Sequence, residues 1–319
     1  MKKIKSWLIV ALALMVIGGI IFTGVMMVLN WDFKKISTVK YETNSYEFED
    51  FNNIKITTST AKIIFKPSTD GKNRVVCFED VNEKHRVTLN EDLLTITEQN
   101  TKKWYQYIGI DFNSPSITLY LDKSEYGDLY IKASTGNLEI PNNFIFKDLD
   151  VTFSTGDVKI NSKKLGELKV KTSTGDITVE NASVKSLELT ASTGEIVVNN
   201  LKSEGDVNIM VSTGKTNLSD ISCKNFNSKG STGKISLKNV MANEKISIER
   251  DTGEVKLDKC DGAEINITTD TGNVSGSLKS EKVFIVKTHT GSVKVPETVT
   301  GGKCEITTDT GDIQIVLDK

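Results

Sequence analysis

Hydrophobic and polar positions alternate along most of the chain in a pattern that repeats every 19 or 20 residues around ten Thr-Gly pairs. The residues six and four before each Thr, and those two and four after each Gly, are apolar with the exceptions Thr216, Ser228 and Gly276. Thirty-six of these forty positions are Leu, Ile, Val or Phe. Alternation with period two is typical of a β-strand with one buried face. The glycines are Gly136, Gly156, Gly175, Gly194, Gly214, Gly233, Gly253, Gly272, Gly291 and Gly311.

The alternation shifts by one residue across each Thr-Gly pair, so the chain must bend there, and glycine supplies the backbone freedom for a tight corner. One such repeat cannot bury its own apolar face, but stacked repeats can. The sequence therefore predicts an all-β fold: a single-stranded β-solenoid, parallel β-helix-like, of about ten 19–20-residue rungs over 129–319. At about 4.8 Å per rung, ten rungs would be about 48 Å long.

The pattern changes before this solenoid. Residues 54–66 form a degenerate copy in which Ala61 replaces the glycine, and we expect a first rung there. Residues 67–128 break the period but retain strand-like alternation, so we expect 30–128 to be a linker and a β-rich N-terminal cap. At the other end the sequence stops soon after Ile315, which leaves the last edge open or covered by another molecule.

An uncharged run from Trp7 to Leu29 precedes the cap. As a helix it would be roughly 34 Å long, enough to span a bilayer. Lys2, Lys3 and Lys5 lie before it, so the positive-inside rule keeps residues 1–6 in the cytoplasm and sends the solenoid outside the cell. Because no small-x-small cleavage site follows, we expect an uncleaved single-pass anchor at 7–29, with the lipid bilayer as its partner.

Composition narrows the function. The net charge of −2 offers no electrostatic basis for binding nucleic acid. Only two histidines are present, which disfavours conventional acid–base or metal chemistry. The four cysteines have neither redox nor zinc-ligand spacing, so we interpret them as small apolar packing residues. No catalytic residue and no bound cofactor are predicted.

Three of the ten corners read Asp-Thr-Gly and one reads His-Thr-Gly. Asp-Thr-Gly also occurs in aspartic proteases, but here it belongs to a repeat whose other members carry Ser, so we interpret it as a turn. Asp251, Asp270, His289 and Asp309 would then form a ladder on successive rungs. Such a ladder is either a solvated stripe or a metal site for Ca²⁺. The column just after Gly, from Asn137 to Asp312, is either a solvated face or a surface for a charged polymer.

Aromatic and basic residues gather in the cap, at Lys102, Lys103, Trp104, Tyr105 and Tyr107. Aromatic rings beside cations suit contact with sugar, peptide or lipid headgroups, and they suit ordinary packing equally well. We take this cluster as the best candidate for a binding patch.

Residues 117–121 (Ile-Thr-Leu-Tyr-Leu) and 134–141 (Ser-Thr-Gly-Asn-Leu-Glu-Ile-Pro) carry a family resemblance. With the repeated corners over 45–319, the chain resembles the bacterial "putative adhesin" family, a domain of unknown function. The resemblance implies a β-solenoid envelope protein, in some cases encoded with envelope-stress regulators. It implies no catalytic or binding residues.

We therefore expect a non-enzymatic, membrane-anchored extracellular scaffold that binds a cell-wall polymer or a membrane protein, its oligomeric state being open. Two alternatives stay open. One is an accessory regulator of envelope-stress sensing, which needs a membrane partner because the tail is short. The other is a carbohydrate-active enzyme, for which only the Asp/His ladder supplies converging acids and bases.

Overall fold

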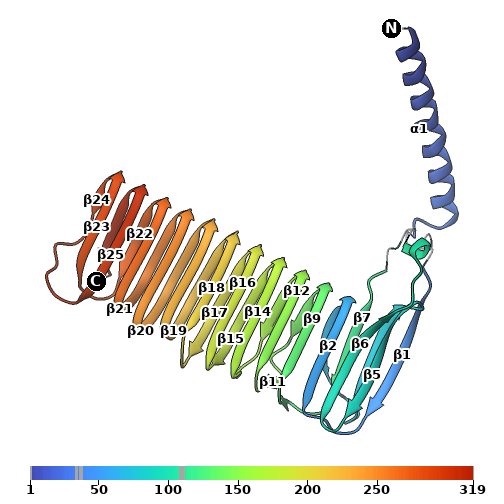
Figure 1. The fold of residues 1–319 in the computed structure, drawn as a ribbon, viewed down its shortest axis with the longest axis horizontal. Coiled ribbons are helices and arrows are strands. Elements are labelled where there is room, and N and C mark those ends of the chain that lie inside the picture. The colour runs from blue at the N-terminus through green and yellow to red at the C-terminus, as the bar shows by residue number, and fades with distance from the viewer. Residues whose placement is uncertain (1, 33–34, 36–38, 108–110, 112, 319) are drawn as a thin grey trace.

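The computed structural model describes residues 2–32, 35, 39–107, 111 and 113–318. Met1 of the expected tail, residues 33–34, 36–38, 108–110 and 112 of the expected linker and cap, and Lys319 lie outside the described residues. The described chain is a long β-solenoid with one apolar helix at its N-terminus (Figure 1). The predicted fold class is confirmed.

The helix, α1 (Lys2–Val28), contains a 23-residue span from Ser6 to Val28 that is long and apolar enough to cross a membrane. None of its apolar 18-residue stretch is buried inside the rest of the protein, although Met26, near the end of the helix, is buried. The exposed Leu, Ile and Val side chains of α1 are what a helix in contact with lipid presents.

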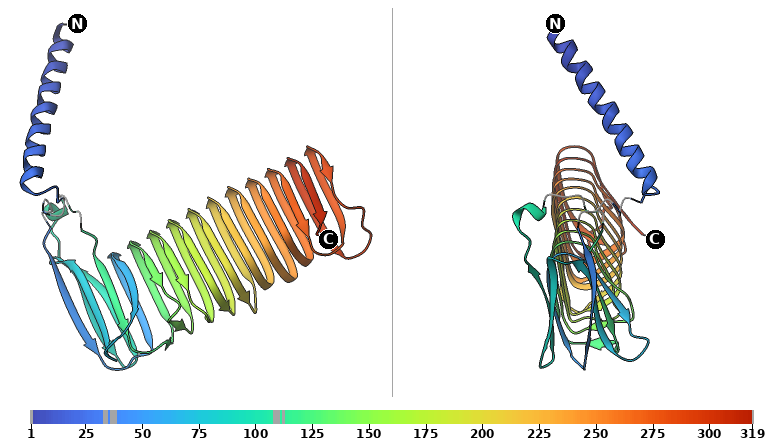
Figure 2. Two further views of the ribbon diagram at one scale, coloured as in Figure 1. Left: turned by 180° about the vertical axis from the view of Figure 1, so that it is seen from behind. Right: turned by 90° about the vertical axis from the view of Figure 1, so that its right-hand side faces the viewer.

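Two parallel sheet faces form the solenoid, seen end-on in Figure 2. The first face holds the strands that lead into each Thr-Gly corner, and the second face holds the strands that leave it. The first-face strands are β2 (Asn53–Thr60), β9 (Leu129–Thr135), β12 (Leu149–Thr155), β14 (Glu167–Thr174), β16 (Ser186–Thr193), β18 (Val207–Thr213), β23 (Lys282–Thr290) and β25 (Gly302–Thr310). The second-face strands are β3 (Lys62–Pro67), β10 (Leu138–Ile140), β13 (Val158–Asn161), β15 (Ile177–Val184), β17 (Ile196–Ser203), β22 (Val274–Leu278), β24 (Val293–Lys294) and β26 (Ile313–Leu317).

Three long strands cross from the second face of one rung to the first face of the next. They are β19 (Thr216–Thr232), β20 (Ile235–Thr252) and β21 (Val255–Thr271). A short two-stranded sheet of β8 (Glu125–Tyr126) and β11 (Ile145–Phe146) begins the third side of the early rungs.

Stacking explains why glycine occupies the corners. Gly214 has φ 148°, and a Cβ built on it would lie 1.8 Å from the carbonyl oxygen of Gly194 on the rung below. A second corner lies six residues after each Gly in the central rungs, and there the backbone has φ between 53° and 57°. Asn and Asp tolerate this left-handed conformation better than most residues. The second-corner residues are Asn181, Asn200, Asp220, Asn239 and Lys259.

The interior is a continuous apolar core in which all four cysteines are buried and unpaired. Burial raises the pKa of each thiol, to about 12 for Cys77, Cys223 and Cys304 and about 11 for Cys260. Ser228 points inward at a position that is apolar in most repeats, and its hydroxyl accepts a hydrogen bond from a buried cation. Arg250 is buried on the neighbouring rung, and its guanidinium donates to the Ser228 hydroxyl at 2.8 Å.

The last rungs do not stack in sequence order. On the first face β25 lies between β21 and β23 and pairs with both. On the second face β26 likewise lies between β22 and β24. The last rung in the sequence, β25 and β26, thus lies between the rung of β21 and β22 and the rung of β23 and β24 (Figure 1). The expectation that the solenoid ends on the strand containing Ile315 is wrong: β23 and β24 form the terminal rung.

The opposite end is closed by antiparallel strands. β6 (Leu93–Asn100) and β7 (Ser116–Leu121) extend the faces beyond β2 and β3. β5 (Glu83–Asn90) pairs antiparallel with β6, β4 (Asn73–Asp80) with β7, and β1 (Tyr41–Phe48) with β4. Antiparallel strands end the parallel stack on this side and cover its core.

Candidate functional site

The aromatic cluster lies on a loop between β6 and β7, where Trp104–Tyr107 form one turn of 3₁₀ helix, η2. Trp104 is 77% exposed, Tyr105 52% and Tyr107 58%. The Trp104 and Tyr105 rings meet edge to face, with centroids 6.0 Å apart. A single exposed aromatic ring is common on a protein surface, whereas a group of neighbouring exposed rings marks a contact site. Four of the five expected binding residues, Lys103, Trp104, Tyr105 and Tyr107, are therefore exposed on one loop, 102–107, which we call the aromatic loop.

Lys102 anchors this loop to the cap. Its ammonium group lies 2.7 Å from Asp80 and 2.8 Å from Glu83, and its side chain is largely covered. Although burial opposes the charge, hydrogen bonds to both carboxylates raise the pKa of Lys102 above its usual value. Lys102 therefore positions the loop, and Lys103 is the basic residue that is presented to solvent.

The Asp/His ladder has a different order from the expected one. Because β25 lies between β21 and β23, the column runs Asp251, Asp270, Asp309 and then His289. His289 Nδ1 lies 3.0 Å from Asp309 Oδ1, and both side chains are about 60% exposed. His289 ends the column and does not separate Asp270 from Asp309. No three of these residues bring ligand atoms within 4.8 Å of one another in the described chain, and Ca²⁺ binding there stays a prediction.

The column just after Gly has a structural use. The Asp157 carboxylate accepts the backbone N–H of Asp176 at 3.0 Å, and the Asp176 carboxylate accepts that of Glu195 at 2.7 Å. Asn137 and Asn273 make the same contact with the next rung. These side chains satisfy corner amides that would otherwise lack partners, which explains the acidic and amide residues in the column.

A buried polar network joins the cap strands. His85 Nδ1 lies 2.7 Å from Glu79 Oε2, and His85 Nε2 lies 2.9 Å from the Thr58 hydroxyl. Asn44 donates to the other Glu79 oxygen at 2.7 Å. Burial opposes the negative charge, but the hydrogen bonds from His85 and Asn44 hold the pKa of Glu79 below its usual value. Thr58, His85 and Glu79 follow the hydroxyl–imidazole–carboxylate order of a catalytic triad.

Burial limits what this network can do. Thr58 is 5% exposed and His85 is 3% exposed, so a substrate has no access to the hydroxyl. Cys77, Glu79 and His85 place one ligand atom each within 4.8 Å, which fits a metal by distance. However, burial and then the Glu79 charge raise the pKa of Cys77 to about 12, which opposes the thiolate that a zinc site uses. The arrangement is best suited to closing the cap.

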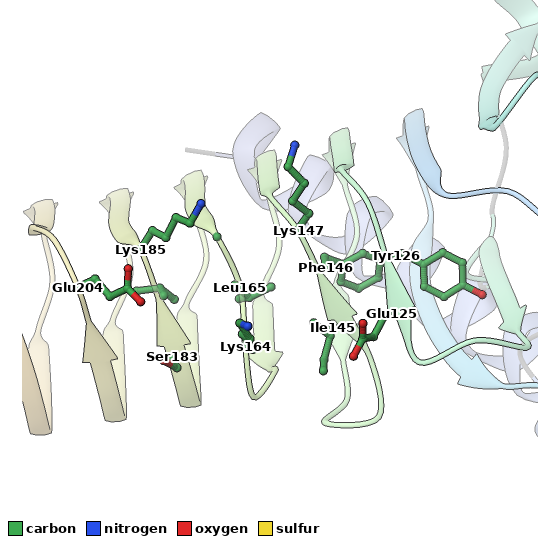
Figure 3. Close-up of a pocket in the computed structure, with 12 residues that line it drawn as sticks. Glu125, Tyr126, Ile145, Phe146, Lys147, Lys164, Leu165, Ser183, Lys185 and Glu204 are labelled. Atoms are coloured by element: carbon green, nitrogen blue, oxygen red, sulfur yellow. The ribbon is translucent and has the colours of Figure 1, made fainter.

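The third side of the early rungs carries a groove of about 360 Å³ (Figure 3). Its floor is apolar, from Tyr126, Phe146, Leu165 and Val184. Lys147 and Lys185 extend to one side of it in Figure 3, and Lys164, Glu125 and Glu204 complete its charged lining. We call this feature the lysine groove.

Backbone pairing sets the spacing of two of these lysines. Gly166 N–H donates to Lys147 C=O at 2.5 Å, and Lys185 N–H donates to Gly166 C=O at 2.9 Å. Lysine and glycine thus alternate rung by rung, and a Cβ on Gly166 would meet the Lys147 carbonyl oxygen at 2.3 Å. Alternate rungs place successive lysines about 10 Å apart.

A family model described as Toastrack DUF4097 matches residues 51–212 and 205–319. The chain belongs to this family. The family resemblance predicted from the sequence is confirmed, and it extends over the cap as well as the solenoid. No curated protein matches the chain.

Several solved structures are similar at low identity. A putative adhesin from Parabacteroides merdae matches at 14% identity and TM-score 0.44, over 87% of this chain and 96% of its own. A putative lipid binding protein from Parabacteroides distasonis matches at 14% and 0.43, over 88% and 98%. A putative cell adhesion protein from Clostridium sporogenes matches at 9% and 0.28, over 88% and 100%.

Sequence reasoning missed the lysine groove and the buried His85 network. The groove had a faint signal, because Gly127, Lys147, Gly166, Lys185 and Gly205 follow the repeat interval. The network had none, because Thr58, Glu79 and His85 meet only when three strands of the cap assemble.

Proposed function

We propose that this protein is a non-enzymatic, membrane-anchored extracellular scaffold that binds an extended anionic polymer of the cell envelope along the lysine groove. The observation that carries the proposal is the groove itself: successive rungs line its apolar floor, and Lys147 and Lys185 stand on alternate rungs at its edge. A hollow that runs along the stack suits a chain-like ligand better than a compact molecule. Three lysines and two glutamates line the groove, and two further carboxylates, Asp128 and Asp148, lie beside Lys147.

Ion pairs on the groove rim leave room for a ligand. Lys147 lies 3.6 Å from Asp128 and 3.7 Å from Asp148, at distances typical of weak surface pairs, and its side chain is 70% exposed. Neither Lys164 nor Lys185 has an ion-pair partner among the described residues. An anionic group can therefore approach the ammonium groups without first breaking a strong pair.

The direct test uses the full chain in nanodiscs and measures binding to purified teichoic acid and to soluble peptidoglycan fragments. The variant Lys147→Ala/Lys164→Ala/Lys185→Ala should raise the Kd for at least one polymer by about tenfold, because exposed ion pairs contribute roughly 0.2–1 kcal/mol each. A matched control, Lys132→Ala/Lys171→Ala/Lys215→Ala, removes the same charge from exposed lysines on other surfaces. Equal losses in both variants would sink the proposal, as would no binding of either polymer by the unaltered protein.

A second candidate function is an accessory role with a protein partner, and the terminal rung favours it. Within the described chain β23 pairs only with β25, so its outer backbone edge is free to accept a strand. Val283 is 39% exposed and Ile285 51%, an apolar character that unprotected edges avoid. If a membrane partner adds a strand here, Ile285→Lys should abolish its stoichiometric co-purification. Met210→Lys, at an apolar position 50% exposed in mid-solenoid, should leave it intact.

A further inference from the structure

We infer that the aromatic loop is a second membrane contact, with Trp104 and Tyr105 seated in the lipid–water interface beside the anchor. The inference rests on the membrane anchoring in the proposed function and is independent of the lysine groove. It assigns a lipid surface to a part of the cap that no other described element covers.

The aromatic loop is fixed close to the point at which the chain enters the cap from the anchor. β1 begins at Tyr41, thirteen residues after the end of α1 at Val28, so the cap cannot lie farther than about 45 Å from the end of the helix. Tyr41 pairs with Asp80 across the β1–β4 ladder, and Asp80 holds Lys102 at 2.7 Å. The loop is thus bonded to the strand end at which the chain enters the cap. Figures 1 and 2 show α1 and η2 at the same end of the cap.

The second support is the rigidity of the loop. Lys103 N–H donates to the Gln106 side-chain oxygen at 2.8 Å, and Gln106 N–H donates to the Lys103 carbonyl at 2.9 Å. Asn100 donates to the Tyr107 hydroxyl at 2.7 Å, and the Lys102 ammonium lies 5.5 Å from the Tyr107 ring centroid. These contacts fix the turn, so the two leading rings are held in solvent by the fold.

The third support is composition. Trp and Tyr are enriched where a bilayer meets water, because each ring is largely apolar and carries one polar group. Lys103 can extend its ammonium group towards phosphate while its methylene stem follows the rings. Trp31, just beyond α1, is also 53% exposed, so tryptophan occurs at both points of contact. A bilayer interface explains this set of exposed groups, whereas a sugar or peptide site gives no reason for its position beside the anchor.

The test uses the full chain in vesicles of brominated phosphatidylcholine and phosphatidylglycerol, with single-tryptophan variants. Trp7→Phe/Trp31→Phe leaves Trp104 as the reporter, and Trp7→Phe/Trp104→Phe leaves Trp31. Adding Met210→Trp to Trp7→Phe/Trp31→Phe/Trp104→Phe reports the middle of the solenoid. We expect bromine to quench Trp104 to the same degree as Trp31 and to leave the reporter at position 210 unquenched. Lys102→Met, which releases the loop, should lower the quenching of Trp104.

Three other outcomes would overturn the membrane contact of the aromatic loop. Quenching at Trp31 without quenching at Trp104 overturns the inference and leaves the anchor intact. Absence of quenching at Trp31 as well shows that the anchor itself is wrong, and the inference falls with it. If bromolipid did not quench Trp104 but soluble glycan changed its emission, the loop would bind a polymer instead of lipid. That result would also overturn the inference.

Discussion

Replacing the corner glycine Gly214 by alanine should destabilise the solenoid far more than replacing a glycine outside the stack. The added Cβ would lie 1.8 Å from the Gly194 carbonyl oxygen, well inside van der Waals contact, at a backbone φ of 148°. Strain in this region costs about 1–3 kcal/mol. Relieving the contact must push the rung of Gly194 away and weaken the 3.1 Å bond from Gly194 N–H to the Thr213 carbonyl, at about 1 kcal/mol more. We expect a total of about 3 kcal/mol.

The matched control is Gly71→Ala. Gly71 also has a positive φ, 72°, but no atom lies within 4 Å of the place that an added Cβ would occupy, so only the conformational cost of about 1–2 kcal/mol applies. Urea unfolding of the full chain in detergent, followed by circular dichroism, gives both free energies of unfolding. Equal midpoints and slopes for the two variants would refute the account of why glycine occupies the corners.

Three further predictions test other parts of the molecule. Asp270→Cys/Asp309→Cys should form a disulfide on mild oxidation, and Asp270→Cys/His289→Cys should not, because only the first pair occupies neighbouring rungs. If mass spectrometry found the reverse, the last rungs would be stacked in the order of the sequence. Glu79 has a lowered pKa when folded, so its contribution is present above the unfolded value of about 4.3 and is lost as pH falls through the folded value. Glu79→Gln should therefore cost more stability at pH 7 than at a pH below the folded pKa of Glu79, and a pH-independent cost in thermal melts would contradict this. Arg250→Met should change the free energy of unfolding in urea little, because removal of a buried cation whose pKa burial lowers to about 10 offsets the loss of its hydrogen bond to Ser228; a large loss of stability would contradict this.

The rungs could be predicted because they depend on local rules. Inward alternation and a glycine corner recur within every 19–20 residues, and each rung needs only its neighbour to bury its face. The order of the last rungs could not be predicted in this way, because rungs with the same pattern are interchangeable as neighbours. One signal was available: the seventh residue after Gly is apolar in the five central repeats, from Ala182 to Cys260, but it is Lys279 and then Thr298 in the following rungs.

The sites were predicted unevenly for a related reason. The aromatic loop could be found from sequence because its five residues are adjacent, but the role of Lys102 depends on Asp80 and Glu83, which lie across a hairpin. The lysine groove depends on side chains about 20 residues apart that share a surface only after stacking. Its polar residues looked like ordinary solvent-facing positions until the third side of the rungs was defined.

Cysteine labelling in intact cells tests the central claim, a solenoid held outside the cell by an N-terminal anchor. The native thiols are buried, so the unaltered protein should resist a membrane-impermeant maleimide. Ser212→Cys, at an exposed corner of the solenoid, should react in intact cells, and Ser6→Cys should react only after the membrane is opened. Labelling of Ser6→Cys in intact cells, with Ser212→Cys protected until permeabilisation, would contradict the claim.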